Sequence, residues 1–145
     1  MEKSNYHKLI LRTSFVTPHT IQEFPNHDLL PIFIARNISN SGLIGKWNGT
    51  SIHFKELSPS PILLRDWKSG RIDRDEFEKK FLLEMSEINF DTILRRISFL
   101  CDVSRASGAV LMGYGSDRLE CHRSILSDII NQSGILENKV IELIL

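Results

Sequence analysis

The sequence lacks several features that would place it in a specialised class of protein. Its 145 residues hold two cysteines, Cys101 and Cys121, which are too few for a disulfide framework and do not form a CxxC pair. No apolar run is long enough to cross a bilayer, and residues 1–8 are polar rather than an export signal. These absences argue against a disulfide-rich secreted scaffold and against membrane insertion, and they predict a cytoplasmic location.

An excess of charge of either sign is also absent. The chain has 18 basic and 18 acidic residues, so general capture of nucleic acid or of an anionic membrane is not expected. Apolar residues make up 41% and charged residues 25%, which is typical of a globular protein and unlike a disordered one. At this length we expect one domain, spanning residues 1–145, around a single core.

The apolar pattern predicts strands that alternate with helices. Four short apolar runs predict strands, within residues 8–15 and at 30–34, 109–112 and 140–145. Four segments predict helices, namely one capped by Ser60 with Pro61 after it, one starting at Asp73, one at about 91–101 and one at 124–133. This order predicts an α/β fold, a single compact domain with a small, mostly parallel sheet flanked by helices. The last run is equally consistent with a homodimer contact.

The segment from Ala109 to Ile130 is where the pattern indicates chemistry. An apolar strand ends at a glycine turn, and the next helix opens with Cys121-His122-Arg123. Open α/β sheets bind ligands outside the carboxyl ends of their strands, and a helix start offers unpaired N–H groups to an anion. The sequence therefore predicts an anion site here, with Arg123 as a bidentate clamp. In the same site Cys121 would be an activated thiolate, and His122 a proton donor, acceptor or orienting group.

A structural role is the alternative interpretation of this triplet. A cysteine near a helix start is commonly a small buried apolar residue, and a neighbouring histidine and arginine are often solvated. Zinc is disfavoured because no second ligand pair stands at finger spacing, and neither a metal nor a cofactor is predicted. Cys101 lies on an apolar helical stripe, which predicts core packing. The charged run 71–76 is interpreted as a solvated helix start.

Other candidate ligand-binding residues lie near predicted strand ends. Arg36 follows the second predicted strand, where pocket residues gather, although an exposed salt bridge accounts for it equally well. Residues 37–48 are rich in Asn, Ser and Gly and predict a surface loop. Trp47, His53 and Lys55 suggest a lid over a ligand, with Trp47 stacking on a base. A surface tryptophan that covers the edge of the core is an equal alternative.

The order of these pieces resembles a known family. The apolar run 109–112, followed by Gly113-Tyr114 and then by Cys121-His122-Arg123, is similar to the carboxyl-terminal signature of the domain-of-unknown-function family 488 (DUF488). Residues 11–15, 31–36, 54–59 and 62–73 are similar to earlier parts of that family in order and spacing. The resemblance spans about Leu9 to Leu143.

The resemblance implies a compact α/β domain with a set of shared polar positions. Here these positions are Ser14, Arg36, Lys55, Tyr114, Cys121, His122 and Arg123. No reaction is implied. The sequence also departs from the family at the end of the 109–112 strand, where it reads Gly113-Tyr114-Gly115-Ser116 in place of a segment with an acidic and a basic residue. Small glycines at this place would widen the space for a ligand.

Three functions are consistent with these observations. The first is binding or sensing of a small phosphorylated or nucleotide-like molecule at the Cys-His-Arg helix start. The second is an enzyme that acts on a nucleotide or nucleoside, with Cys121 as nucleophile, His122 as acid/base and Arg123 as anion clamp. The third is a protein-interaction module in which the 37–48 loop and the helix carrying Arg95 and Arg96 form the partner surface. The missing strand-end carboxylate favours binding over catalysis.

Overall fold

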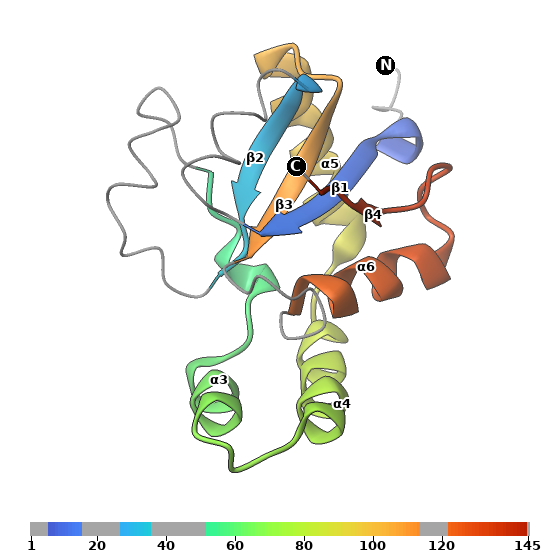
Figure 1. Cartoon of the computed structure of the whole chain (residues 1–145). Coiled ribbons are helices and arrows are strands. Elements are labelled where there is room, and N and C mark those ends of the chain that lie inside the picture. Colours follow the sequence, from blue (N-terminus) through green and yellow to red (C-terminus); the bar gives the residue numbers. More distant parts are fainter. Residues whose placement is uncertain (1–5, 16–26, 36–51, 114–121, 145) are drawn as a thin grey trace.

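The computed structural model describes residues 6–15, 27–35, 52–113 and 122–144 of the chain. The strands are β1 (Ile10–Phe15), β2 (Leu29–Phe33), β3 (Gly108–Gly113) and β4 (Ile141–Glu142), and all are parallel in the order β2-β3-β1-β4. The helices are η1 (Tyr6–Lys8), η3 (Lys55–Leu57), α3 (Pro61–Lys68), α4 (Arg74–Met85), α5 (Phe90–Ser104) and α6 (His122–Ser133). The predicted α/β fold with a small parallel sheet is confirmed (Figure 1).

The sheet is built around β3 and β1. Their pairing runs from Ile10 opposite Gly108 to Phe15 opposite Gly113. A Cβ atom at Gly108 would lie 2.4 Å from the carbonyl oxygen of Ile10, so glycine is what allows the two strands to approach here. Because all strands run the same way, their carboxyl ends meet at one edge of the sheet. We call this edge, where β1, β2, β3 and β4 end, the carboxyl edge.

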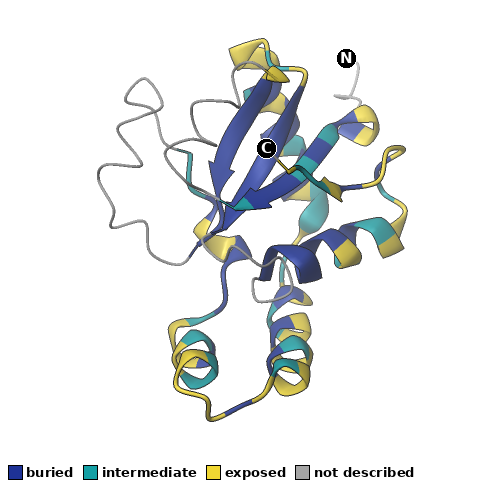
Figure 2. Ribbon diagram, in the orientation of Figure 1, coloured by how far each residue is buried: buried dark blue, intermediate teal, exposed yellow. Residues whose placement is uncertain are grey.

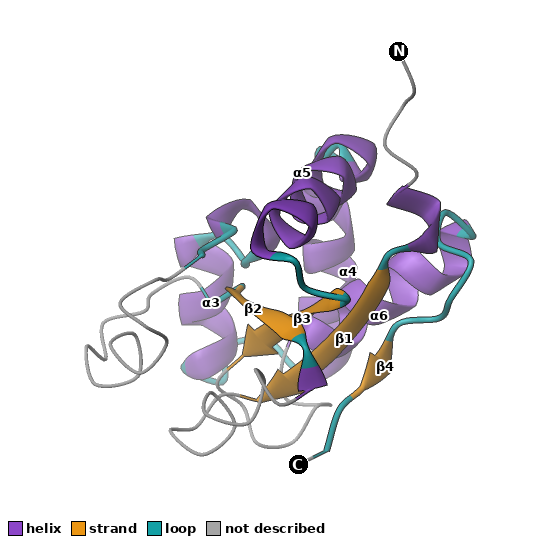
Figure 3. Ribbon diagram, turned by 90° about the horizontal axis from the view of Figure 1, so that it is seen from above, coloured by secondary structure: helices purple, strands orange, loops and turns teal. Residues whose placement is uncertain are grey.

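Both faces of the sheet are apolar, as expected for parallel strands. On one face Leu11, Ile32 and Leu111 join a core cluster that includes side chains of α4, α5 and α6. On the other face Phe33 and Met112 are buried as well. Figure 2 shows β2 and β3 buried along their whole length, and Figure 3 shows, from above, α5 running alongside the sheet and β4 next to β1.

The helix starts follow the capping pattern of the sequence. The Ser60 hydroxyl accepts from the Leu63 amide at 3.3 Å, and Pro61 occupies the first position of α3. The Asp73 carboxylate accepts from the Glu76 amide at 2.8 Å and caps α4. Both predicted helix starts are confirmed.

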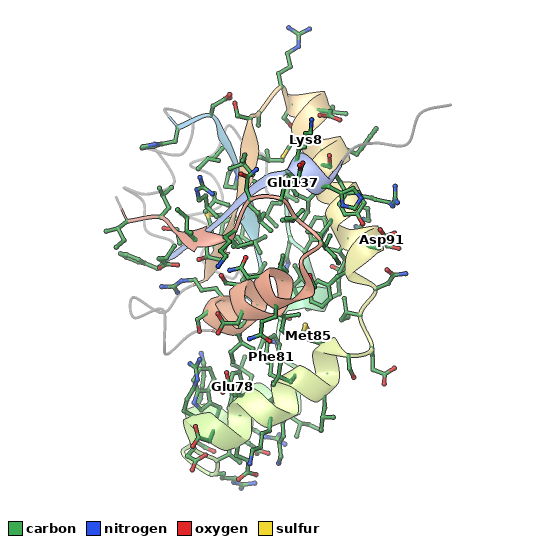
Figure 4. The ribbon with its side chains drawn as sticks, turned by 90° about the vertical axis from the view of Figure 1, so that its right-hand side faces the viewer. Lys8, Glu78, Phe81, Met85, Asp91 and Glu137 are labelled. Carbon is green, nitrogen blue, oxygen red and sulfur yellow. The ribbon has the colours of Figure 1, made fainter. Side chains whose placement is uncertain are left out.

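Aromatic residues join α3 and α4 to the rest of the core. The Trp67 ring of α3 stacks on the Phe77 ring of α4 with centroids 3.7 Å apart. Phe81 follows one turn later and is fully buried. In Figure 4, Phe81 and Met85 lie on the side of α4 that faces α6. The short α3–α4 arm seen in Figure 1 is therefore continuous with the main core.

Several element boundaries differ from the prediction, by one residue in β2 and β3 and by more in α5 and β4. Helix α5 runs further than 91–101 and ends at Ser104, with Arg105 as its C-cap at a positive φ of 58°. Helix α6 begins at His122, inside the Cys-His-Arg segment with which the helix was predicted to open, and β4 covers two residues of the predicted 140–145 strand. Within the described part of the chain, no helix is long and apolar enough to span a membrane.

Candidate functional site at the carboxyl edge

The first turn of α6 begins at the carboxyl edge of the sheet. Its three leading side chains, His122, Arg123 and Ser124, are all buried. Because successive residues point in different directions around a helix, each of the three reaches a different neighbour. The turn therefore connects α6 to the ends of β2 and β4 and to α4.

Arg123 forms the central ion pair of this site. Its side chain has 0% exposure, and Nη2 lies 2.9 Å from Oε2 of Glu142 in β4. The Nε atom donates to both carboxylate oxygens, at 3.1 and 3.2 Å. The same carboxylate accepts the Thr13 hydroxyl of β1 at 2.6 Å. In this geometry the guanidinium is committed to Glu142, and its predicted role as a clamp on a ligand stays a prediction.

His122 is fixed between the end of β2 and α4. Its Nε2 lies 2.8 Å from the carbonyl oxygen of Ile34, and its ring meets Phe81 edge-on with centroids 5.6 Å apart. A carbonyl oxygen only accepts, so Nε2 carries a proton. In a neutral ring Nδ1 is then the basic nitrogen. The orientation of His122 is thus set by the backbone and by a core aromatic.

Ser14 lies at the same edge but on the opposite face of the sheet from Thr13, because successive strand residues alternate. Its buried hydroxyl donates to the carbonyl of Leu143 at 3.0 Å. Ser14 therefore holds the chain after β4 against β1. This contact and the Thr13–Glu142 contact join the end of β1 to Glu142 of β4 and to Leu143 after it.

His53 and Lys55 lie beside the end of β2. The Phe54 amide donates to the Phe33 carbonyl at 2.9 Å, which aligns residues 52–54 with the strand. The His53 Nε2 atom lies 2.6 Å from the Ala35 carbonyl oxygen. Lys55, in η3, is exposed. The structure thus places these two predicted lid residues next to the carboxyl edge.

Four of the predicted site residues lie outside the described ranges. They are Arg36, Trp47, Tyr114 and Cys121. Of the Cys-His-Arg triplet, the structure therefore describes His122 and Arg123. The roles predicted for the four residues stay predictions.

Glu142 is not among the residues predicted from the sequence, although a signal for it exists. Residues 140–145 are apolar except for this one carboxylate. An acid inside an otherwise apolar run that is predicted to be a strand calls for a partner, because an unpaired buried charge is costly. The partner, Arg123, is supplied by another element and could not be named from the pattern.

Arg74 was also missed, because the run 71–76 was interpreted as a solvated helix start. That interpretation does not hold for Arg74, whose Nη2 donates to the Ser124 hydroxyl at 3.1 Å. Its guanidinium carbon lies 6.0 Å from the centroid of the Trp67 ring. The signal was its spacing, since Arg74 stands three residues before the buried Phe77 and shares its face of α4.

The two arginines of α5 form ion pairs, one within the helix and one with η3. Arg95 binds Asp91 at 2.9 Å and Arg96 binds Glu56 at 3.2 Å. The hydrogen bond from Tyr6 to Asp91, followed by that from Arg95, lowers the pKa of Asp91. Cys101 is buried in the core as predicted, and burial raises the pKa of its thiol to about 11. In the described segments, no three His, Cys, Asp or Glu side chains gather where they could hold a metal ion.

A parallel sheet with a helix starting at its carboxyl edge is the arrangement of the open α/β proteins that bind ligands at that edge. The active DUF488-N3 subclade matches residues 27–134 of the chain. The chain therefore belongs to the DUF488 family. The matched segment contains β2, β3 and the helices α3 to α6, while Thr13 and Glu142 lie outside it. Neither a curated protein nor a solved structure matches the chain significantly.

Proposed function

We propose that the protein binds a small phosphorylated or nucleotide-like ligand at the carboxyl edge, beside the first turn of α6. The observation that carries the proposal is the gathering of buried polar side chains at this edge. They are Thr13, Ser14, His122, Arg123 and Ser124, most of the buried polar or charged residues of the described chain. Burial of polar groups is unfavourable, so their concentration at a strand edge is more typical of a ligand site than of packing alone.

The electrostatics of the edge favour an anion. Arg123 and Glu142 balance each other, so this pair adds little net charge. The start of α6 contributes the positive end of a helix of 12 residues. Backbone N–H groups at such a position bind phosphate oxygens directly. We expect this binding to take place in the cytoplasm, with a small anion rather than nucleic acid as the partner.

The test is a thermal-shift screen against mononucleotides, cyclic dinucleotides, ADP-ribose derivatives and sugar phosphates. A ligand at a hundred times its Kd stabilises the wild type by about 2.7 kcal/mol. The variants Ser14→Ala and His122→Gln are expected to lose most of this shift. If no compound shifts the wild type, the proposal fails.

Ser127→Ala is the matched control for Ser14→Ala. Both serine hydroxyls are buried, and each donates to a backbone carbonyl near the end of the chain, Ser127 to Val140 at 3.2 Å. Ser127 lies in the second turn of α6, one turn further from the carboxyl edge than His122, Arg123 and Ser124. The control should keep the ligand shift of the wild type. Equal losses in both serine variants would point to a general loosening of β4 instead.

Catalysis at the same edge is the second candidate, because the matched subclade is described as active. Glu142 also supplies a carboxylate to this edge, although not from the end of β3. In this reading Cys121 is the nucleophile and His122, with a basic Nδ1, is the acid/base. Mass analysis of each stabilising compound after incubation decides between binding and turnover. The control Cys101→Ser should retain turnover. Turnover that also survives Cys121→Ser and His122→Ala would exclude the roles of Cys121 and His122.

A protein-interaction surface on α5 is the remaining alternative. A hollow of about 370 Å³ on this helix is lined by Thr92, Arg95, Arg96, Phe99 and Leu100. Phe99 is 64% exposed, and Val103, one turn further along α5, is 66% exposed. Sedimentation of the wild type and of Phe99→Ser over a range of concentrations tests whether this face joins two copies. A monomer at every concentration would remove the homodimer prediction.

A further inference from the structure

Arg74 connects three helices beside the candidate site. It is the first residue of α4 and stands on the same face as Phe77 and Phe81. Its Nη2 donates to Ser124 in the first turn of α6, and its guanidinium lies over Trp67 of α3. The cation is therefore held next to the same helix turn that begins at the carboxyl edge.

The hydrogen-bonding capacity of Arg74 is not used up by its neighbours. Its Nη1 atom is buried and finds no hydrogen-bond acceptor in the structure. A buried N–H group without an acceptor is destabilising, so such a group calls for an explanation. None of the ion pairs formed within the described ranges includes Arg74.

The charge of Arg74 also differs from that of the second arginine at this turn. Arg123 is neutralised by Glu142, whereas Arg74 meets a neutral hydroxyl and an aromatic ring. Arg74 is half-buried as a whole, so part of it is in contact with solvent beside the first turn of α6. A phosphate or carboxylate oxygen supplies the acceptor that Nη1 lacks.

Resting on the proposed function, we infer that Arg74 binds the anionic group of the ligand, with Ser124 orienting its guanidinium. The positive end of α6 and the fixed charge of Arg74 then act on the same phosphate. Arg74 becomes the residue by which the site distinguishes a phosphorylated molecule from its uncharged counterpart.

The experiment compares the four ribonucleoside monophosphates with the four nucleosides by calorimetry on the full chain. The wild type should prefer the phosphorylated member of at least one pair. Arg74→Met keeps the length of the side chain and removes its charge, so it should lower affinity for that monophosphate by about tenfold to a hundredfold. Affinity for the nucleoside should stay unchanged.

Arg71→Met is the matched control. It removes the same charge from the exposed side of the same segment, where Arg71 lies 3.9 Å from Asp66. The control should keep the preference for phosphate. A full phosphate preference in Arg74→Met overturns the inference while leaving the proposed function intact. If the wild type binds no compound of the wider panel, both the proposed function and the inference about Arg74 fail. If the wild type binds nucleosides and monophosphates equally well, only the inference fails.

The thermal stability of the ligand-free variants gives a second readout. If Arg74 serves only to pack α4 against α6, Arg74→Met should lower Tm. If the Nη1 group of Arg74 gains its acceptor only when a ligand binds, removing that group from the ligand-free protein should leave Tm unchanged or raise it. A marked fall in Tm together with unchanged binding identifies Arg74 as a structural residue.

Discussion

At the scale of single residues, the Arg123–Glu142 pair ties α6 to β4. With 0% and 13% side-chain exposure, the two charges are largely removed from water. We predict that Glu142→Ala lowers the free energy of unfolding by about 3–5 kcal/mol, because it leaves the guanidinium buried without its partner. Urea unfolding measures this loss.

The double variant Arg123→Met/Glu142→Ala is the comparison. Removing both charges also removes the unpaired one, so its loss of stability should be smaller than the sum of the two single losses. Additive losses would mean that the two residues contribute separately and that the pair is not a unit.

Cys101 gives a pH-dependent prediction. Its pKa is raised from 9.0 to about 11, mainly by burial and then by the negative charges of Asp102 and Asp28. Between these values the unfolded thiol ionises while the folded thiol keeps its proton, so the contribution of Cys101 to stability falls as pH rises. The slope is about 1.4 kcal/mol per pH unit.

Cys101→Ala isolates this effect from other groups that titrate in alkali. The difference in unfolding free energy between wild type and variant should shrink as pH is raised from 9 to 11. A difference that stays constant over this range would show that the buried thiol ionises as easily as an unfolded one.

Residue roles were predictable from the sequence where local spacing decides them. The stripe that carries Cys101 identified a core position, and the caps at Ser60 and Asp73 were identified by the residues after them. The partner of Arg123 was not predictable. It comes from β4, and a contact between distant parts of the chain depends on how the elements pack.

At the scale of elements, the pairing of β1 with β3 depends on Gly108. A Cβ there would approach the Ile10 carbonyl to 2.4 Å and the Ile10 Cβ to 2.8 Å, both on the neighbouring strand. We predict that Gly108→Ala lowers the free energy of unfolding by about 3 kcal/mol, because the central strands must separate.

Gly134→Ala is the matched comparison. Gly134 ends α6 with a φ of +69°, and a Cβ there would meet nothing within 4 Å. Its cost is limited to the left-handed backbone, about 1 kcal/mol. Guanidinium unfolding of both variants gives the ranking, and an equal loss at the two positions would exclude steric contact as the cause at Gly108.

The elements were predictable to different degrees. Strands β2 and β3 and helices α3 and α4 follow from compact apolar runs and from capping residues. The ends of α5 did not follow, because Phe90 and residues 102–104 continue the helix without a sequence signal that marks them. Of the predicted strand at 140–145, only Ile141 and Glu142 pair with β1, opposite Arg12 and Thr13. An apolar run does not indicate how many of its residues find a partner strand.

At the scale of the whole molecule, the α3–α4 arm and the sheet share one core. Phe77 and Phe81 belong to the same buried cluster as Leu111. We predict that urea unfolds both together. In a Trp47→Phe variant Trp67 is the sole tryptophan, so its fluorescence reports on α3 while far-UV circular dichroism reports on all helices. The two transitions should coincide, and an earlier fluorescence transition would make the arm a separate unit.

The strand order has a consequence for how the protein is made. Strand β1 precedes β2, β3 and β4 in the chain, yet both of its neighbours, β3 and β4, are synthesised after α5. While a ribosome is producing the middle of the chain, both edges of β1 are without their partners. Contacts of such large sequence separation slow folding and prolong exposure to chaperones. We therefore expect nascent chains that end before β3 to lack a stable sheet.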